Sequence, residues 1–250
     1  MNSFISWIGG KKLLRKKILE QFPEQGEVER YVEVFGGAGW VLFGKDSHAS
    51  LEVFNDANSE LINLYRCVKY HPGALQKELD GLLMSRELFF DAIHPNERLT
   101  DIQRAARFFT AIKESYGSDR KSFGLRPKNL QKAVDFLSLA SGRLAKVVIE
   151  HQDFEQILKT YDSPKTLFYL DPPYYSTEKY YPDRFLAADH LRLKKALEKI
   201  SGRFLLSYND CKEIRDLYRG YEILKVDRAN NLKNKEQGNR YQELLIKNYK

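Results

Sequence analysis

The chain has 250 residues, of which 42% are hydrophobic and 30% charged, and a formal net charge of +7 at pH 7, so it can bury one sizeable core and carry a smaller insertion. Its two cysteines, Cys67 and Cys211, lie far apart, its histidines do not cluster, and no stretch approaches the roughly 20 apolar residues of a membrane span. These features argue against a disulfide framework and a metal site, and they lead us to expect a cytoplasmic protein with no membrane partner.

The spacing of apolar residues predicts alternating strands and helices, interrupted by one mainly helical stretch. We therefore expect an α/β fold with a mainly parallel, doubly wound sheet, which the last two strands close as an antiparallel hairpin. Helices are predicted at 11–21, 40–44, 59–70, 71–84, 101–116, 129–146, 188–200 and 212–218, and strands at 31–35, 51–54, 147–149, 166–170, 204–208, 222–226 and 243–249.

A glycine-rich turn, Gly36-Gly37-Ala38-Gly39, follows the first predicted strand and precedes the apolar segment 40–44. Glycines at such a turn let the backbone approach a ligand closely, and a helix that starts there adds unpaired N–H groups. A dinucleotide fingerprint, G-x-G-x-x-G, would need a third glycine where Leu42 stands. The turn therefore predicts a ligand site of another kind.

The second predicted strand ends in Asn55-Asp56, and Asp56 stands 17 positions after Gly39. In the mononucleotide-binding halves of such sheets, an acidic side chain at this point accepts hydrogen bonds from the ribose hydroxyls. Asp56 is therefore a candidate ribose ligand. The alternative is that it caps the helix predicted at 59–70.

Positive charge is concentrated in two windows of the sequence. Residues 119–146 hold seven lysines and arginines against two acidic residues, and residues 225–250 hold seven against three. The part of the first window between Arg120 and Lys132 holds five basic residues and no acidic one, which suits a loop that neutralises DNA phosphates. A solvated surface run is the alternative. The predicted DNA contacts are Arg120, Lys121, Arg126 and Lys128.

The tetrad Asp171-Pro172-Pro173-Tyr174 directly follows the apolar strand predicted at 166–170. The ends of strands are where open α/β sheets bind their ligands. Each proline removes a backbone donor, so the carbonyl groups here can face a ligand. The tetrad thus offers hydrogen-bond acceptors and an aromatic face, which match an amino-bearing base, although a strand-terminating turn would also read this way.

These motifs, in this order, resemble the alpha group of the Dam-type DNA adenine N6-methyltransferases, which use S-adenosylmethionine. The resemblance runs nearly from end to end. The residues that match the family's opening aromatic and Gly-Gly-Lys, its Phe-x-Gly-x-Gly loop, its acidic strand end, its Asp-Phe element and its Asp-Pro-Pro-Tyr are Trp7, Gly9, Gly10, Lys11, Phe35, Gly37, Gly39, Asp56, Asp153, Phe154 and 171–174.

The resemblance implies that 171–174 is the catalytic tetrad and that S-adenosylmethionine is bound with Lys11 near its carboxylate and Asp153-Phe154 at its adenine. The other residues that it implies for cofactor binding are Trp7, Gly10, Phe35, Gly37, Gly39 and Asp56. Core packing is the alternative for Trp7, and helix capping is the alternative for Asp153. The resemblance also implies a catalytic domain made of 1–70 and 147–250. The segment 71–146 becomes an inserted DNA target-recognition region, with duplex DNA and a cognate restriction endonuclease as candidate partners and the oligomeric state open.

The chemistry expected of the tetrad follows from the weak nucleophilicity of the exocyclic amine of adenine. The Asp171 carboxylate and the Pro172 carbonyl can each accept one N6 proton, which localises the nitrogen lone pair and stabilises the charge that develops on it. Tyr174 would stack on a base that has left the duplex. Phe185 and Tyr175 are candidates for further walls of the site, with ordinary packing as the alternative.

One stretch departs from the family pattern, because Ser115 to Gly124 lacks the Asn-Gly-rich recognition loop of GATC methylases. GATC specificity is therefore not carried over, and Arg120, Lys121 and Arg126 could contact either bases or phosphates. Three alternative functions stay open from the sequence: an N4-cytosine methyltransferase, an RNA adenine methyltransferase, and a catalytically silent DNA-binding protein.

Overall fold

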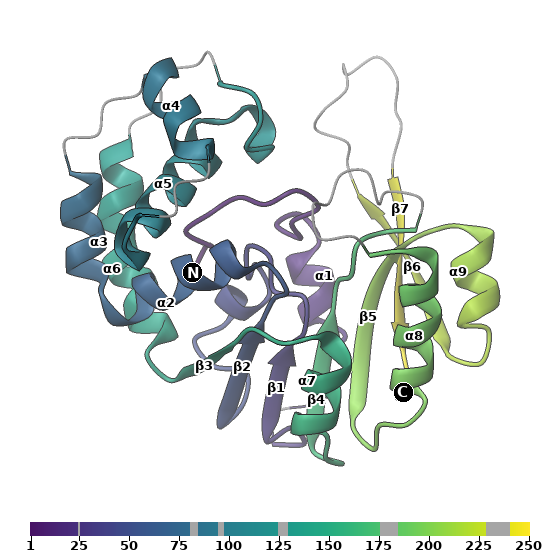
Figure 1. The fold of residues 1–250 in the computed structure, drawn as a ribbon. Coiled ribbons are helices and arrows are strands. Elements are labelled where there is room, and N and C mark those ends of the chain that lie inside the picture. Colours follow the sequence, from purple (N-terminus) through teal and green to yellow (C-terminus); the bar gives the residue numbers. More distant parts are fainter. Residues whose placement is uncertain (25, 81–84, 95–97, 125–129, 176–184, 229–240) are drawn as a thin grey trace.

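The computed structural model describes residues 1–24, 26–80, 85–94, 98–124, 130–175, 185–228 and 241–250 (Figure 1). The strands are β1 (Arg30–Glu33), β2 (Leu51–Asn55), β3 (Val147–Glu150), β4 (Thr166–Leu170), β5 (Arg203–Asn209), β6 (Glu222–Arg228) and β7 (Tyr241–Lys247). The helices are α1 (Arg15–Leu19), α2 (Ser59–Tyr70), α3 (Pro72–Leu79), α4 (Arg86–Ile93), α5 (Asp101–Glu114), α6 (Leu130–Leu144), α7 (Phe154–Tyr161), α8 (Ala187–Leu197) and α9 (Lys212–Leu217), with short 3-10 turns η1 (Leu42–Gly44) and η2 (Tyr116–Ser118).

The strands form one sheet in the order β3-β2-β1-β4-β5-β7-β6. The first five strands pair in parallel, whereas β7 lies antiparallel between β5 and β6 (Figure 1). The predicted parallel sheet with a C-terminal antiparallel hairpin is therefore confirmed. Along the chain, the sheet grows outward from β1 in one direction and from β4 in the other. The carboxyl ends of these two strands thus form the crevice in which sheets of this kind bind ligands.

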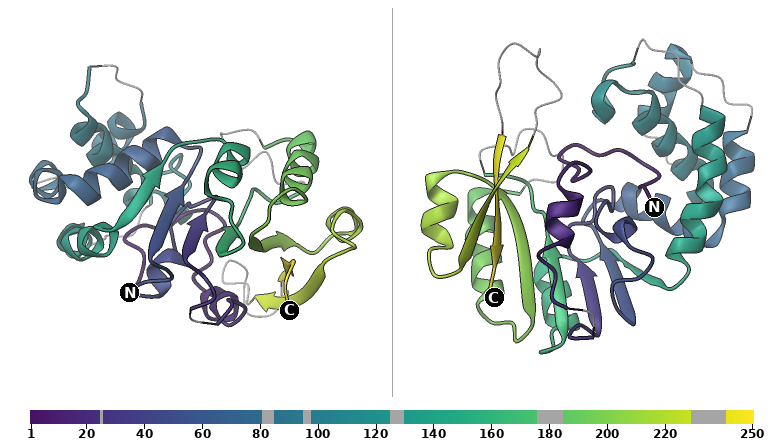
Figure 2. Two further views of the ribbon diagram at one scale, coloured as in Figure 1. Left: turned by 90° about the horizontal axis from the view of Figure 1, so that it is seen from below. Right: turned by 180° about the vertical axis from the view of Figure 1, so that it is seen from behind.

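Both faces of the sheet are covered, as the doubly wound prediction requires (Figure 2). In β4, Leu167 and Tyr169 pack into the core under α1, α2, α5 and α6, and Phe168 and Leu170 pack into the core under α7, α8 and α9. All five residues of β4 are buried, which explains why its sequence is a continuous apolar run rather than an alternating one. The strand that ends in the tetrad is therefore held rigidly from both sides.

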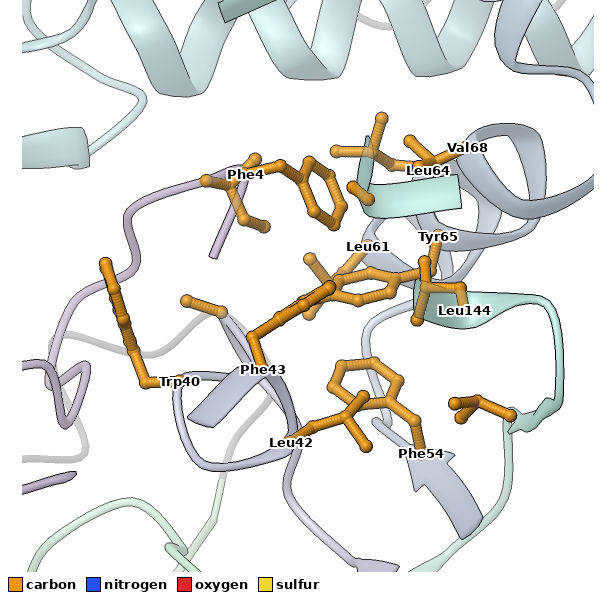
Figure 3. Packing of buried hydrophobic residues seen from close by; sticks show 14 of the residues in the cluster. Phe4, Trp40, Leu42, Phe43, Phe54, Leu61, Leu64, Tyr65, Val68 and Leu144 are labelled. Carbon is orange, nitrogen blue, oxygen red and sulfur yellow. The ribbon is translucent and has the colours of Figure 1, made fainter. Parts of the chain in front are cut away.

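An aromatic core lies directly beneath the glycine turn (Figure 3). The ring of Phe54 stacks on Tyr65 with their centroids 4.1 Å apart, and Phe4 meets Tyr65 edge-on at 4.9 Å. Gly39 has φ +64°, and a Cβ atom added there would lie 2.9 Å from the Tyr65 hydroxyl. A glycine is required at this position because a side chain would clash with the core and strain the backbone.

Helices α3 to α6 gather to one side of the sheet, beyond β3 (upper left in Figure 1). The described part of 71–146 contributes no strand to the sheet. Arg143 of α6 anchors this group, because its guanidinium donates to both carboxylate oxygens of the buried Glu52 on β2, at 2.7 and 2.8 Å. It also donates to the carbonyls of Leu42 and Lys45.

Two predicted helices need correction, and two helices of the structure have no predicted range. The helix predicted at 40–44 is only the 3-10 turn η1, and the helix predicted at 11–21 shrinks to α1, whose start has no side-chain cap. The helices without a predicted range are α4, which Ser85 caps by accepting the N–H of Leu88, and α7, which entered the sequence analysis only through the capping alternative for Asp153. Short helices of this kind depend on tertiary packing more than on their own propensity.

Candidate active site

A pocket that is partly open to solvent lies at the carboxyl ends of β1 and β4. Segments far apart in the sequence meet there: the amino-terminal turn, the glycine turn, the end of β2, the tetrad and the 3-10 turn η2. The predicted site residues that line the pocket are Trp7, Gly10, Lys11, Phe35, Gly37, Gly39, Asp56, Arg120 and Asp171.

Backbone hydrogen bonds orient Asp56 in this pocket. The N–H of Gly37 donates to Asp56 Oδ2 at 2.8 Å, and the N–H of Asn58 donates to Asp56 Oδ1 at 2.8 Å. The N-cap of α2 is Asn58, whose side chain accepts the N–H of Leu61, so the alternative of Asp56 as the cap residue does not hold. These backbone contacts fix the Asp56 carboxylate at the edge of the pocket.

Arg120 lies in an unexpected place for a predicted DNA contact. Its guanidinium stacks over Trp7, 4.5 Å from the ring centroid, and lies 5.3 Å from the ring of Phe108. Arg120 therefore joins the basic segment to a wall of the pocket. Lys121 is exposed and does not line the pocket, and Arg126 and Lys128 fall outside the described residues.

Asp171 is held by two donors that both contact the same oxygen. Lys11 Nζ lies 2.7 Å from Asp171 Oδ1, and the Ser207 hydroxyl donates to Oδ1 at 2.8 Å. No hydrogen bond or ion pair within the described ranges involves Asp171 Oδ2. Burial raises the pKa of Asp171, and the Lys11 ammonium opposes that rise. The family resemblance led us to expect Lys11 near the carboxylate of the cofactor. In the structure, the carboxylate that Lys11 contacts is that of Asp171 in the tetrad.

Tyr174 is tied to a residue that the sequence analysis missed. Its hydroxyl donates to Glu243 Oε2 at 2.5 Å, and Lys11 Nζ lies 4.7 Å from the centroid of its ring and 3.8 Å from Glu243 Oε2. Burial raises the pKa of Tyr174, and the negative charges of Asp171 and Glu243 raise it further. Tyr174 does not line the pocket, although the neighbouring Pro173 does.

The predicted Asp-Phe element lies one layer behind the pocket. Asp153 is the N-cap of α7 and pairs with Arg192 at 2.6 Å, which matches the capping alternative. Phe154 is buried and packs against Phe35 and Phe185, each with ring centroids 5.8 Å away. Phe185 lines the pocket itself, so it is a wall of the site as well as part of the core.

Pro172 of the tetrad and Tyr175, which follows the tetrad, have different surroundings. Pro172 is buried and does not line the pocket, and no donor within the described ranges contacts its carbonyl oxygen. Tyr175 packs against His190 with ring centroids 5.2 Å apart, and its N–H donates to Asn209. Ordinary packing therefore accounts for Tyr175.

The described residues hold neither a candidate metal-ligand group nor a membrane-spanning helix. They contain no group of three or more histidine, cysteine, aspartate or glutamate side chains that could hold a metal ion. None of their helices is both long enough and apolar enough to cross a membrane.

Comparison with known proteins identifies the family. Residues 7–232 match the family described as D12 class N6 adenine-specific DNA methyltransferase. The chain is 24% identical to the type II methyltransferase M1.LlaDCHI of Lactococcus lactis subsp. cremoris, with 100% of this chain and 96% of that protein covered. It is 30% identical to the type II methyltransferase M.MjaIII of Methanocaldococcus jannaschii, with 98% of each chain covered.

The structure also resembles a precorrin 8w decarboxylase of Methanobacterium thermoautotrophicum, with a TM-score of 0.43, 11% identity, and 94% of this chain and 88% of the other covered. This likeness is too distant to support any argument about function. The family match, by contrast, spans nearly the whole chain and confirms the activity predicted from the motifs. The chain belongs to the D12 class of N6 adenine-specific DNA methyltransferases, and its reaction is the methylation of adenine in DNA.

Proposed function

We propose that the pocket binds S-adenosylmethionine and that Asp171 receives the N6 amino group of an adenine flipped out of duplex DNA. The observation that carries this proposal is the asymmetry of the Asp171 carboxylate. Lys11 and Ser207 hold Oδ1, and no donor in the described ranges contacts Oδ2. The side chain is 18% exposed and lines the pocket, so Oδ2 is the oxygen available to accept an N6 proton.

The cofactor half of the pocket fits a nucleoside with a charged tail. Gly37 and Gly39 have positive φ, and a Cβ on Gly37 would lie 3.0 Å from the Trp7 ring. Because these residues have no side chains, a ligand can approach the backbone of the turn closely. Asp56 would accept the ribose hydroxyls. Trp7 and Phe35 would offer apolar walls, with Phe154 supporting Phe35 from behind. Gly10 lines this side, Lys11 lines the pocket beside Asp171, and Asp153 would act by capping the helix that carries Phe154.

S-adenosylmethionine, when bound, supplies a methyl group that its positively charged sulfur already activates. The protein must then align the adenine nitrogen with that methyl carbon. Asp171 Oδ2 and the Pro172 carbonyl would each accept one N6 proton, which favours a pyramidal nitrogen with its lone pair directed at the methyl group. The carboxylate would also stabilise the positive charge that grows on the nitrogen during transfer.

The DNA half of the proposal rests on charge and position. We propose that 71–146 forms the target-recognition region and that 1–70 with 147–250 forms the catalytic domain. Arg120 and Lys121, with Arg126 and Lys128 in the same basic segment, would neutralise phosphates near the pocket. The named relatives are type II methyltransferases, which supports a cognate restriction endonuclease as a partner in the cell.

Product analysis tests this proposal. Duplex DNA is incubated with the purified protein and S-adenosylmethionine, digested to nucleosides, and analysed by mass spectrometry. N6-methyladenine is the expected product, and it should depend on S-adenosylmethionine and on Asp171. N4-methylcytosine, methylation of RNA in preference to DNA, or DNA binding without any modified base would each overturn the assignment in favour of one of the alternatives.

A further inference from the structure

A buried acidic residue on the last strand faces the tetrad. Glu243 lies on β7, where its backbone pairs with Asn209 of β5 and Val226 of β6, and it is 2% exposed. Its neighbours along the strand, Leu244 to Ile246, are buried and apolar. A carboxylate is costly to bury among such residues unless it is paired and hydrogen-bonded. Glu243 meets that condition through the groups of the catalytic site.

The contacts of Glu243 form a chain that ends at Asp171. Glu243 Oε2 accepts the Tyr174 hydroxyl at 2.5 Å and lies 3.8 Å from Lys11 Nζ. The same ammonium lies 2.7 Å from Asp171 Oδ1 and donates to the carbonyl of Gly9 at 2.9 Å. Lys11 thus lies between the buried Glu243 and the partly exposed Asp171. With all three groups ionised, this group, which we call the acid–lysine–acid cluster, has a formal net charge of −1.

The net charge of this cluster matters for methyl transfer, because positive charge develops on the adenine nitrogen as the new bond forms. Lys11 alone would neutralise Asp171 and remove the electrostatic advantage of a carboxylate. A second carboxylate beside Lys11 restores that advantage while Lys11 still orients Asp171. The hydrogen bond from Tyr174 also limits rotation of the ring that follows the tetrad prolines.

We propose that Glu243 is a positioning residue of the methyl-transfer reaction, which keeps the acid–lysine–acid cluster negative and holds the Tyr174 phenol. The inference rests on the proposed function of Asp171 and assigns the strand β7 a part in the chemistry. Glu243 acts through Lys11 and Tyr174 and is not placed against the substrate.

Single-turnover methyl transfer at saturating DNA and cofactor tests this role. Glu243→Gln keeps an acceptor for the Tyr174 hydroxyl but removes the charge, so the rate should fall about ten- to a hundredfold with little change in either affinity. Tyr174→Phe removes only the hydroxyl and should slow transfer less. Glu52→Gln is the matched control, because Glu52 is another buried sheet carboxylate with a cationic partner, Arg143, on β2.

A double variant separates a charge effect from a structural one. Lys11→Met combined with Glu243→Gln removes one charge of each sign, so the cluster returns to −1 through Asp171 alone. We expect the double variant to be faster than the product of the two single effects predicts. It also removes both of the buried charges, those of Lys11 and Glu243, so it provides a measurable protein even if Glu243→Gln alone fails to fold.

Three outcomes decide the matter. A near wild-type rate for Glu243→Gln would overturn the proposal, and so would strictly multiplicative effects in the double variant. A comparable slowing by Glu52→Gln would mean that loss of any buried carboxylate has the same consequence, which contradicts a specific role. If the wild-type protein forms N6-methyladenine and Asp171→Asn does not, the proposed function stands whatever Glu243 does, so the two failures are distinguishable.

Discussion

The two halves proposed for the pocket, one for the cofactor and one for the substrate, are built by different means. The cofactor half depends on backbone: two glycines with positive φ, N–H groups that hold Asp56, and an aromatic core beneath the turn. The substrate half depends on buried charge, because Asp171 is held by Lys11, which is shared with Glu243. Substitution of one charged side chain leaves the backbone of the cofactor half in place. In the substrate half, substitution of any one charged residue changes the electrostatic potential at the site of methyl transfer. Variants of the two halves should therefore separate binding from chemistry.

The largest effect is expected in the substrate half. Asp171→Asn keeps the size of the side chain but removes its charge, and its NH2 group can present a donor toward the substrate amine. Loss of one such electrostatic partner typically slows the chemical step about 10²- to 10³-fold. Single-turnover transfer measures the step, and calorimetry with S-adenosylmethionine should give an unchanged affinity. Near wild-type transfer would remove Asp171 from the centre of the mechanism.

A smaller effect of the opposite kind is expected in the cofactor half. Asp56→Ala removes the acceptor proposed for the ribose and should weaken S-adenosylmethionine binding by about 1.5 to 3 kcal/mol, measured by calorimetry without DNA. The transfer rate at saturating cofactor should change little. Asn58→Ala is the control, because it removes the N-cap of the same helix without removing a carboxylate. Equal losses in both variants would point to loop disorder rather than ribose binding.

Arg120 lies both in the lining of the pocket and in the basic segment, so its loss should affect cofactor binding and DNA binding together. Arg120→Ala should weaken S-adenosylmethionine binding modestly through the loss of its stacking on Trp7. It should also make the dependence of log DNA affinity on log salt shallower by about one unit if it contacts a phosphate. Lys121→Ala is the control, since Lys121 lies outside the pocket and should change only the salt dependence. A cofactor affinity unaltered by Arg120→Ala would mean that the stacking has no role in binding.

The smallest effect concerns pH, through a carboxyl group at the floor of the pocket. Burial raises the pKa of Glu33 from its ordinary 4.5 to about 8, so the folded protein binds this proton more tightly than the unfolded chain does. The stabilisation is complete below pH 4.5 and is lost as the pH rises through about 8. Glu33→Gln should flatten thermal stability against pH across that window. An identical pH dependence in both proteins would contradict the assignment.

The sequence alone predicts the sheet well, for physical reasons that differ from strand to strand. The strand β4 was predicted with its correct bounds, because four consecutive apolar residues after Thr166, with Pro164 before them and Asp171-Pro172-Pro173 after them, have few alternatives. The helix predicted at 40–44 is wrong, since the same apolar residues, including Phe43, are buried beneath the glycine turn whether or not they form a regular helix.

The candidate site divides in the same way. Residues carried by contiguous motifs, such as Gly37 and Asp171, line one pocket in the structure. The partner of Lys11 could not be predicted, because the pair with Asp171 joins positions 160 residues apart. Glu243 left one signal in the sequence, a single acid beside the apolar run 244–246, but only the register of β7 against β5 shows that it faces the tetrad.

The position of β7 has a consequence for the protein during its synthesis. This strand fills the gap between β5 and β6, yet it is the last of the seven to leave the ribosome. Until it arrives, the apolar strand β5 presents an unpaired edge, which is the kind of surface that promotes aggregation of nascent chains. Glu243 also reaches the tetrad only when β7 pairs with β5. A nascent chain would therefore contain the glycine turn and the tetrad before Glu243 could contact Tyr174 and Lys11.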